Sequence, residues 1–227
     1  MSRMYPLVDA IHVLLKGRPW DYAFCGGWAI DLFLGRQTRR HSDVDLLAYW
    51  PDRDRLIEDM KALGFTVYEM LGGGLAHRIT DVRVQRRIKR NIFCIRQGCD
   101  LVRLKEAGEP EIFAIDFRRI GQTQPDFLEF LFNDRTPEEF LYARDPSIRR
   151  DQRKAILSAG GIPYLAPELC LLYKSTDIQR EGYQQDCEQA AARMDSEQKA
   201  WLAGALARLY PQGHPWIAVL DGGASAL

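Results

Sequence analysis

The pattern of apolar and polar positions divides the chain into short segments of two kinds. In some segments apolar residues recur every three or four positions and a glycine or proline follows, which is typical of amphipathic helices. Such helices are predicted at residues 5–18, 28–34 and 54–63. Other segments are apolar throughout or at alternate positions and are bounded by turn residues, which is typical of strands. Such strands are predicted at residues 22–25, 44–50, 65–70, 111–118 and 127–132.

From about residue 162 the pattern changes to that of helices. Pro167 suits the first turn of one helix, and Asp195 is placed to cap a later one. We therefore predict an α+β (α/β) fold in which a mixed, twisted sheet is flanked by helices. The predicted domains are residues 1–145, which contain the sheet, and residues 146–227, which form a small helical C-terminal domain.

The composition is that of an ordinary folded protein, with 46% hydrophobic and 27% charged residues and a net charge of zero. A balanced charge argues against a general polyanion-binding protein. Charged residues interrupt the apolar N-terminal segment at helical spacing, so it predicts neither a signal peptide nor a membrane span. The five cysteines are scattered and lack a matching histidine cluster, which indicates reduced thiols in the cytoplasm.

One local patch of charge lies between residues 78 and 105. It contains nine Lys and Arg against two Asp, interleaved with apolar residues. This pattern predicts antiparallel strands with one basic face. Such a face is either a solvated sheet surface or a surface for phosphate or RNA, and the sequence leaves both open.

Two carboxylates, Asp43 and Asp45, open the predicted strand at 44–50. Side chains two positions apart on a strand point the same way, so these two anions lie close together. A hard divalent ion such as Mg²⁺ suits such a pair, with water and substrate phosphates as its other ligands. The pair follows a Gly26-Gly27 turn, which is either an ordinary tight turn or a place where backbone N–H groups and a helix start favour a phosphate.

The residues at these positions resemble a known signature. The segments 26–31 and 34–46 closely resemble the signature of the aminoglycoside and lincosamide nucleotidyltransferases, which belong to the DNA polymerase beta-like nucleotidyltransferase superfamily. A looser likeness to related bacterial proteins covers residues 162–174. The resemblance implies the nucleotidyltransferase fold and a reaction in which a hydroxyl attacks the α-phosphorus of a nucleoside triphosphate and pyrophosphate leaves.

The resemblance further implies the substrates and part of the site. The nucleotide is ATP or another nucleoside triphosphate, and the acceptor is a hydroxylated small molecule such as an aminoglycoside- or lincosamide-like compound. By this likeness Asp43 and Asp45 hold two Mg²⁺ ions, while Gly26 and Gly27 seat the triphosphate. A third carboxylate on a neighbouring strand completes the metal site and takes the proton of the attacking hydroxyl.

Two residues compete for the position of the third carboxylate. Glu129 and Asp116 each lie in an apolar strand, where an isolated acid needs a partner or a metal. We favour Glu129, because the residues after its strand resemble those that follow the third acid in the relatives. Asp116, which is followed by two arginines, remains the alternative.

Three further residues are candidates for nucleotide binding. Arg39 and His41 precede the carboxylate pair in the signature, and His41 either contacts phosphate or orients the loop. Lys174 lies on a helical face with a partly buried stem. It either contacts the triphosphate or forms an ion pair with Asp177.

Other readings of the function remain open. The acceptor is tRNA or protein in a toxin-like alternative, in which the 78–105 segment binds RNA, and a non-catalytic nucleotide-binding protein is a third possibility. An aminoglycoside is polycationic and requires an acidic site, which the basic segment argues against. The glutamates that would supply such a site are Glu106, Glu109, Glu111, Glu138 and Glu139.

Overall fold

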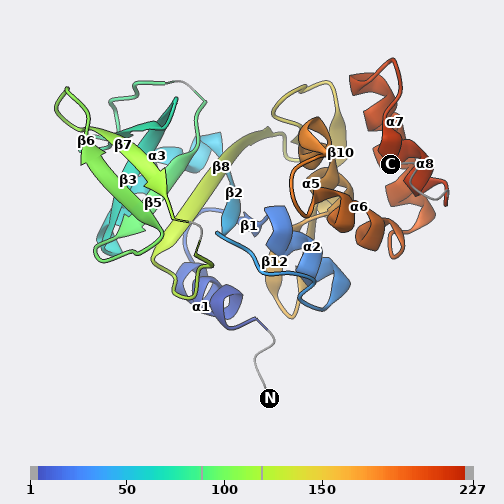
Figure 1. Cartoon of the computed structure of the whole chain (residues 1–227), viewed down its shortest axis with the longest axis horizontal. Helices are drawn as coiled ribbons and strands as arrows, with labels where there is room; N and C mark the ends of the chain where they lie inside the picture. The colour runs from blue at the N-terminus through green and yellow to red at the C-terminus, as the bar shows by residue number, and fades with distance from the viewer. Residues whose placement is uncertain (1–4, 88, 119, 223–227) are drawn as a thin grey trace.

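The structure of the chain is a computed structural model that describes residues 5–87, 89–118 and 120–222 (Figure 1). The helices are α1 (Pro6–Leu15), α2 (Gly26–Leu34), α3 (Arg53–Ala62), α4 (Gln152–Ala155), α5 (Pro167–Lys174), α6 (Tyr183–Ala191), α7 (Ser196–Leu209) and α8 (Pro215–Leu220). The strands are β1 (Ala23–Phe24), β2 (Asp45–Tyr49), β3 (Phe65–Gly72), β4 (Leu75–Arg78), β5 (Ile92–Arg96), β6 (Val102–Glu106), β7 (Ile112–Phe117), β8 (Phe127–Arg135), β9 (Glu139–Leu141), β10 (Arg149–Asp151), β11 (Ile156–Ala159) and β12 (Ile162–Leu165).

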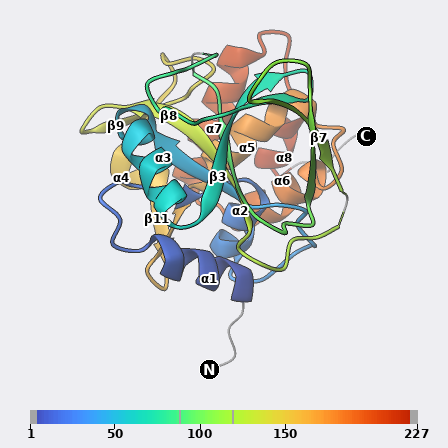
Figure 2. The ribbon, with the colours of Figure 1, turned by 90° about the vertical axis from the view of Figure 1, so that its left-hand side faces the viewer.

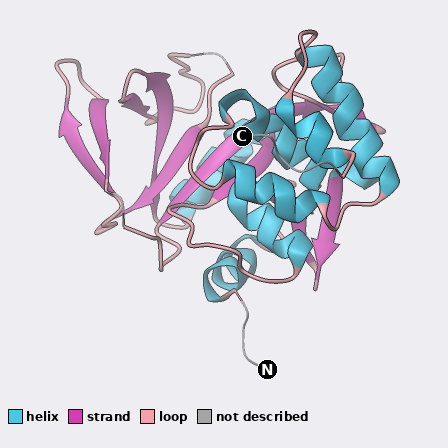
Figure 3. Ribbon diagram, turned by 45° about the vertical axis from the view of Figure 1, so that its right-hand side comes forward, coloured by secondary structure: helices cyan, strands magenta, loops and turns pink. Residues whose placement is uncertain are grey.

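Most strands form one mixed sheet in the order β11-β12-β1-β2-β8-β5-β3-β4-β7-β6. The pairs β1–β12 and β2–β8 are parallel, whereas β9 and β10 extend the end of β8 as a short antiparallel ladder. The strands β3 to β7 gather at one end of the molecule, and α5 to α8 form a helical mass at the other end (Figures 1 and 3). Helix α3 packs against β3 (Figure 2), and the prediction of a mixed α+β fold is confirmed.

The local signals in the sequence account for several of these boundaries. Gly35 ends α2 in the left-handed conformation, at φ 68°, which a residue with a Cβ adopts at a cost. Asp195 caps α7 by accepting a hydrogen bond from the Gln198 backbone N–H at 2.8 Å. The predicted cap at Asp195 is confirmed, and the predicted helix at 28–34 ends at the glycine that follows it.

The strands β11 and β12 lie beyond residue 145, in the part predicted to be helical. They extend the same sheet, because the short apolar run of β12 pairs in parallel with β1. A large core of buried side chains, which includes Ile11, Leu46 and Trp216, connects this sheet to the C-terminal helices. The helical part therefore begins only at α5, and the division into domains 1–145 and 146–227 stays a prediction.

The prediction of antiparallel strands over residues 78–105 is confirmed in part, because β5 and β6 lie in this range and pair antiparallel with their neighbours. Most of the cations of the segment, however, lie outside these two strands. The chain between β4 and β5 forms no strand in its described residues, and residue 88 lies outside them. Several cations here follow one another directly, so no alternating face can be buried. Many of them pair with nearby acids, as in Arg78–Glu111, Arg83–Asp81, Arg86–Glu109 and Lys89–Asp134.

No helix within the described ranges is both long and apolar enough to span a lipid bilayer.

Candidate active site

Two carboxylates meet where β2 and β8 run side by side. The parallel register places Asp45 directly opposite Glu129, and Asp43 lies two residues before Asp45. All three line one cavity of about 580 Å³. Asp116 is exposed on β7 in another part of the sheet and does not line this cavity. The structure therefore brings Glu129, rather than Asp116, to the carboxylate pair.

Burial and mutual repulsion perturb these carboxylates. Burial, followed by the charge of Asp43, raises the pKa of Asp45. Burial, followed by the charge of Asp45, raises the pKa of Glu129, although a hydrogen bond donated by Asn91 Nδ2 opposes this shift. No ion pair between described residues includes any of the three acids. No described cation therefore balances the negative charge of these acids through an ion pair.

A divalent cation fits this set of donors. Asp43, Asp45 and Glu129 offer the oxygen ligands that Mg²⁺ prefers. Within the described residues, no group of three or more His, Cys, Asp or Glu side chains is arranged as a complete metal site, so a metal here would need further ligands. An open arrangement suits Mg²⁺, which usually keeps several waters and binds one or two carboxylates together with substrate phosphates.

Two glycines allow helix α2 to approach the acids closely. Gly26 lines the cavity at φ +62°, and a Cβ at this position would overlap Asp45 Oδ2. A Cβ on Gly27 would overlap the His41 ring, and Gly27 does not line the cavity. Gly26 is therefore the glycine of the predicted pair that touches the site itself.

We expect Gly26→Ala to impair any activity of this site much more than it impairs stability. The alanine side chain would displace Asp45, in addition to a backbone cost of about 1–2 kcal/mol for an L-residue at positive φ. Gly35→Ala is the matched control, because Gly35 has φ +68° and nothing lies within 4 Å of its added Cβ. Turnover and thermal unfolding of both variants check this, and equal activity in the two would contradict it.

A buried acid holds the loop that carries Asp43. Asp31 is fully buried at 0% exposure, and it accepts hydrogen bonds from Thr38 N at 3.0 Å and Thr38 Oγ1 at 2.6 Å. Its other oxygen forms a hydrogen bond with His41 Nε2. The centroids of the His41 and Trp28 rings are 4.5 Å apart. His41 does not line the cavity. The contact with Asp31 is consistent with the loop-orienting role for His41, and a contact of His41 with phosphate stays a prediction.

The buried carboxylate of Asp186 connects two of the predicted nucleotide ligands. It lies 3.1 Å from Lys174 Nζ and accepts hydrogen bonds from Arg39 Nε at 3.2 Å and Nη2 at 3.0 Å. The predicted ion pair of Lys174 with Asp177 is wrong, because Asp186 on α6 reaches the ammonium instead. Lys174 lines the cavity, with Nζ 3.9 Å from the centroid of the Tyr183 ring, whereas Arg39 does not line it.

Several charged residues of the cavity belong to no recognisable sequence motif. Arg144 lies in the turn after β9 and Arg180 in the turn before α6, and both line the cavity. Together with Lys89, Arg90 and Lys174 they place five cations beside the three acids. None of the five glutamates expected to attract a polycation is among the lining residues.

The loop between β4 and β5 is held by another acid that the sequence analysis missed. Glu69 on β3 is 1% exposed and accepts hydrogen bonds from the backbone N–H groups of Arg86 at 2.6 Å and Arg87 at 3.2 Å. The same loop ends in residues 89–91, all of which line the cavity. A lone glutamate in a strand carries no sequence signal for this long-range role.

Comparison with known proteins gives sequence matches to the N-terminal part of the chain. The family described as aminoglycoside-2''-adenylyltransferase matches residues 7–79, which contain Gly26, Asp43 and Asp45. A 2''-aminoglycoside nucleotidyltransferase of Escherichia coli is 45% identical over 56 residues, which is 25% of this chain and 32% of that protein. A protein of the same description from Klebsiella pneumoniae matches to the same extent. The matched segment thus spans about a third of these relatives.

Solved structures extend the likeness to most of the chain. ANT(2'')-Ia in complex with adenylyl-2''-tobramycin has a TM-score of 0.50 and 15% identity, covering 89% of this chain and 96% of that one. The lincosamide antibiotic adenylyltransferase LnuA, lincomycin-bound, has a TM-score of 0.50 and 14% identity, covering 82% and 96%. The chain therefore has the fold of these nucleotidyltransferases, and its N-terminal third resembles the aminoglycoside-2''-adenylyltransferase family in sequence.

Proposed function

We propose that the protein is a Mg²⁺-dependent nucleotidyltransferase of the cytoplasm. It transfers a nucleoside monophosphate, foremost AMP from ATP, to a hydroxyl of a small molecule such as an aminoglycoside- or lincosamide-like compound, and it releases pyrophosphate. The observation that carries this proposal is the register of Asp45 with Glu129, which joins the signature acids to a third acid in one cavity.

Different residues of the cavity bind the metal, bind the triphosphate and take up the proton. Asp43, Asp45 and Glu129 would hold the metal, and Lys174 and Arg180 neutralise the triphosphate. Bound Mg²⁺ would supply charge stabilisation at the reacting phosphate. The acceptor oxygen forms a bond to the α-phosphorus as the bond to pyrophosphate breaks, and Glu129 takes the hydroxyl proton. The raised pKa of Glu129 suits a group that takes up a proton near neutral pH.

The charge of the cavity favours particular acceptors within this class. Beyond the three acids assigned to the metal, the lining contains no carboxylate that would bind an ammonium group of the acceptor. Lys89 and Lys174 have carboxylate partners, but Arg90, Arg144 and Arg180 have none among the described ion pairs. A hydroxylated acceptor of low positive charge is therefore favoured over a strongly polycationic one.

Mg²⁺ is expected to raise the unfolding temperature more at about pH 8.5 than at about pH 6. The raised pKa values of Asp45 and Glu129 mean that ionisation opposes folding. Without metal, the folded protein therefore loses stability as the pH rises from the ordinary carboxyl range through the raised pKa values of these two side chains. Mg²⁺ binds the ionised form and restores this stability. Thermal unfolding with and without MgCl₂ measures the effect.

The variant Glu129→Gln serves as the control for this prediction. It should show a smaller difference between the two pH values, because one of the two titrating groups is gone. An equal stabilisation by Mg²⁺ at both pH values in the wild type would contradict the assignment of these acids to the metal.

The experiment that tests the function is acceptor-dependent release of pyrophosphate. Each of the four ribonucleoside triphosphates is incubated with Mg²⁺ and with tobramycin, lincomycin or bulk tRNA in turn. Release that requires a small-molecule acceptor and is absent in Asp45→Asn is expected. Release with tRNA alone would replace the small-molecule acceptor by a macromolecular one, and triphosphate binding without release would indicate a non-catalytic protein.

A further inference from the structure

Asp186 is a buried acid just outside the cavity of the candidate active site. It belongs to the first turn of α6, its side chain is 1% exposed, and it does not line the cavity. Its carboxylate faces two cations, because it accepts two hydrogen bonds from Arg39 and lies 3.1 Å from Lys174 Nζ. One buried negative charge therefore contacts two positive charges that come from distant parts of the chain.

Lys174 connects Asp186 with the cavity. Its side chain is buried but lines the cavity, and Nζ lies 3.9 Å from the centroid of the Tyr183 ring. An ammonium group has three N–H donors, so Lys174 can keep its contact with Asp186 and still donate to a phosphate. Because a flexible stem carries this ammonium, a fixed partner such as Asp186 decides where the charge lies.

Arg39 extends the contacts of Asp186 to the loop that carries Asp43. Its guanidinium lies close to two glycines, since a Cβ on Gly182 would be 2.7 Å from Nε and a Cβ on Gly27 would be 2.9 Å from Nη2. Helices α2, α5 and α6 pack against one another in this part of the molecule (Figure 1). Asp186 thus ties the end of α5 to the loop that follows α2.

Stability alone is a weak reason for such a buried group of charges. Burial removes the ions from water, and apolar residues in place of a buried ion pair are often equally stable or more stable. Hydrogen bonds between Arg and a carboxylate are directional, however, so they fix the position of the groups that they join. The arrangement around Asp186 is therefore suited to placing a charge.

We propose that Asp186 is a positioning residue for the triphosphate. It holds the Lys174 ammonium at the wall of the cavity, and through Arg39 it keeps this ammonium in a fixed place relative to the loop that carries Asp43. The phosphates meet a cation that is in place before they bind, which lowers the cost of binding. This inference rests on the proposed function, because it requires a nucleoside triphosphate in the cavity.

Asp186→Asn is expected to weaken the binding of ATP by at least about tenfold, because a neutral amide cannot hold both cations in place. The direction of this effect is informative. Removal of a negative charge near the phosphates would by itself strengthen binding, so a loss of affinity reports the position of Lys174. Calorimetric titration of the full chain with ATP and Mg²⁺, without an acceptor, measures the effect.

Lys174→Met shows whether Asp186 acts through the ammonium group. In this background Asp186→Asn should change the affinity for ATP by less than about twofold, because the group that Asp186 positions is absent. A purely structural role of Asp186 would give the same loss in both backgrounds.

Arg39→Lys is a second test, which does not require that Asp186→Asn folds. The variant keeps the positive charge on a side chain that is only partly buried, but it loses the two-pronged contact with the carboxylate. It should weaken ATP binding by at least about threefold in the wild type and by less than about twofold in Lys174→Met.

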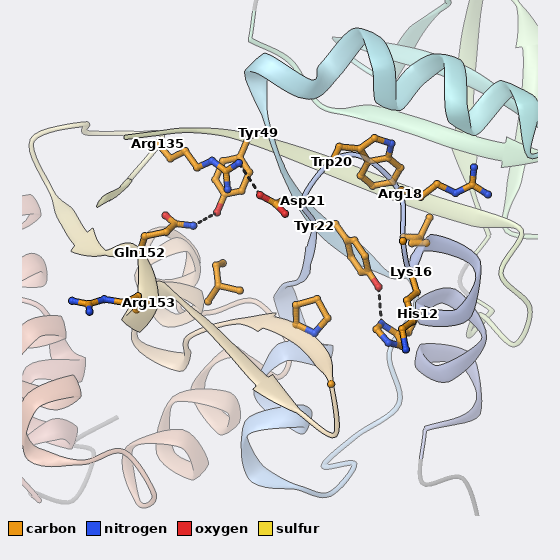
Figure 4. Close-up of a pocket in the computed structure, with 15 residues that line it drawn as sticks. His12, Lys16, Arg18, Trp20, Asp21, Tyr22, Tyr49, Arg135, Gln152 and Arg153 are labelled. Atoms are coloured by element: carbon orange, nitrogen blue, oxygen red, sulfur yellow. Dashed lines mark hydrogen bonds and ion pairs between the residues drawn. The ribbon is translucent and has the colours of Figure 1, made fainter. Parts of the chain in front are cut away.

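Glu168→Gln is the matched control for the loss of a buried charge. Glu168 on α5 is buried and accepts hydrogen bonds from Arg150 Nε at 3.1 Å and Nη2 at 2.7 Å. It lines neither the candidate active site nor a second cavity of about 580 Å³ beside the end of α1 (Figure 4). Its replacement should lower the unfolding temperature but leave the affinity for ATP within about twofold of the wild type.

Three results would overturn the proposal: unchanged or tighter ATP binding in Asp186→Asn, an equal loss of affinity in the Lys174→Met background, or an equal loss in Glu168→Gln. Where Asp186→Asn does not fold, unchanged binding in Arg39→Lys has the same meaning. Each of these results would leave the proposed function intact. A wild type that binds none of the four ribonucleoside triphosphates would overturn both.

Discussion

Replacing Asp45 by asparagine is expected to lower kcat for nucleotidyl transfer by at least about 10³-fold, because a metal ligand contributes several kcal/mol of charge stabilisation. Without metal, the variant should be at least as stable as the wild type without metal. Burial raises the pKa of Asp45, so its negative charge opposes folding at neutral pH and the neutral amide removes that cost. Steady-state kinetics and thermal unfolding measure the two effects.

Asp52→Asn is the matched control for this variant. Asp52 also belongs to an Asp-x-Asp sequence, but it lies at the start of α3 and does not line the cavity. Its replacement should leave kcat within about twofold of the wild type, as is usual for surface substitutions. Activity above about a tenth of the wild-type value in Asp45→Asn would show that this carboxylate does not hold a catalytic metal.

Glu129→Gln is expected to lower kcat by about 10²–10⁴-fold, because it removes a metal ligand and the proposed base together. The amide has nearly the same shape and can keep its contact with Asn91, so the fold should remain intact. Kinetics at saturating nucleotide and acceptor measure the loss.

Asp116→Asn tests the alternative third acid in the same assay. Its side chain is exposed on β7 and lines neither cavity, so its replacement should leave kcat essentially unchanged. The reverse pattern, with full activity in Glu129→Gln and none in Asp116→Asn, would overturn the site as described.

Local sequence signals account for the elements that position the acids. The apolar runs of β2 and β8 and the glycine stop of α2 appear in the sequence as strand and helix signals. The signature residues also locate Asp43 and Asp45. What the sequence left open was which acid faces them, because strand register depends on pairing between segments more than 80 residues apart.

The positions that the sequence missed depend on long-range contacts. Arg180 is an arginine in a turn, and only the packing of α5 and α6 brings it to the cavity. Asp31 carries no local signal of a structural role, but it is fully buried and forms hydrogen bonds with Thr38 and His41. In the same way, no local pattern indicates that Asp186 rather than Asp177 binds Lys174.

The measurement that tests the central claim most directly is the mass of the acceptor after incubation with protein, Mg²⁺ and a nucleoside triphosphate. Our account predicts an acceptor that gains one nucleoside monophosphate, in equal amount to the pyrophosphate released, and no product when Asp45→Asn replaces the wild type. An unchanged acceptor mass accompanied by release of inorganic phosphate would contradict nucleotidyl transfer and indicate hydrolysis instead.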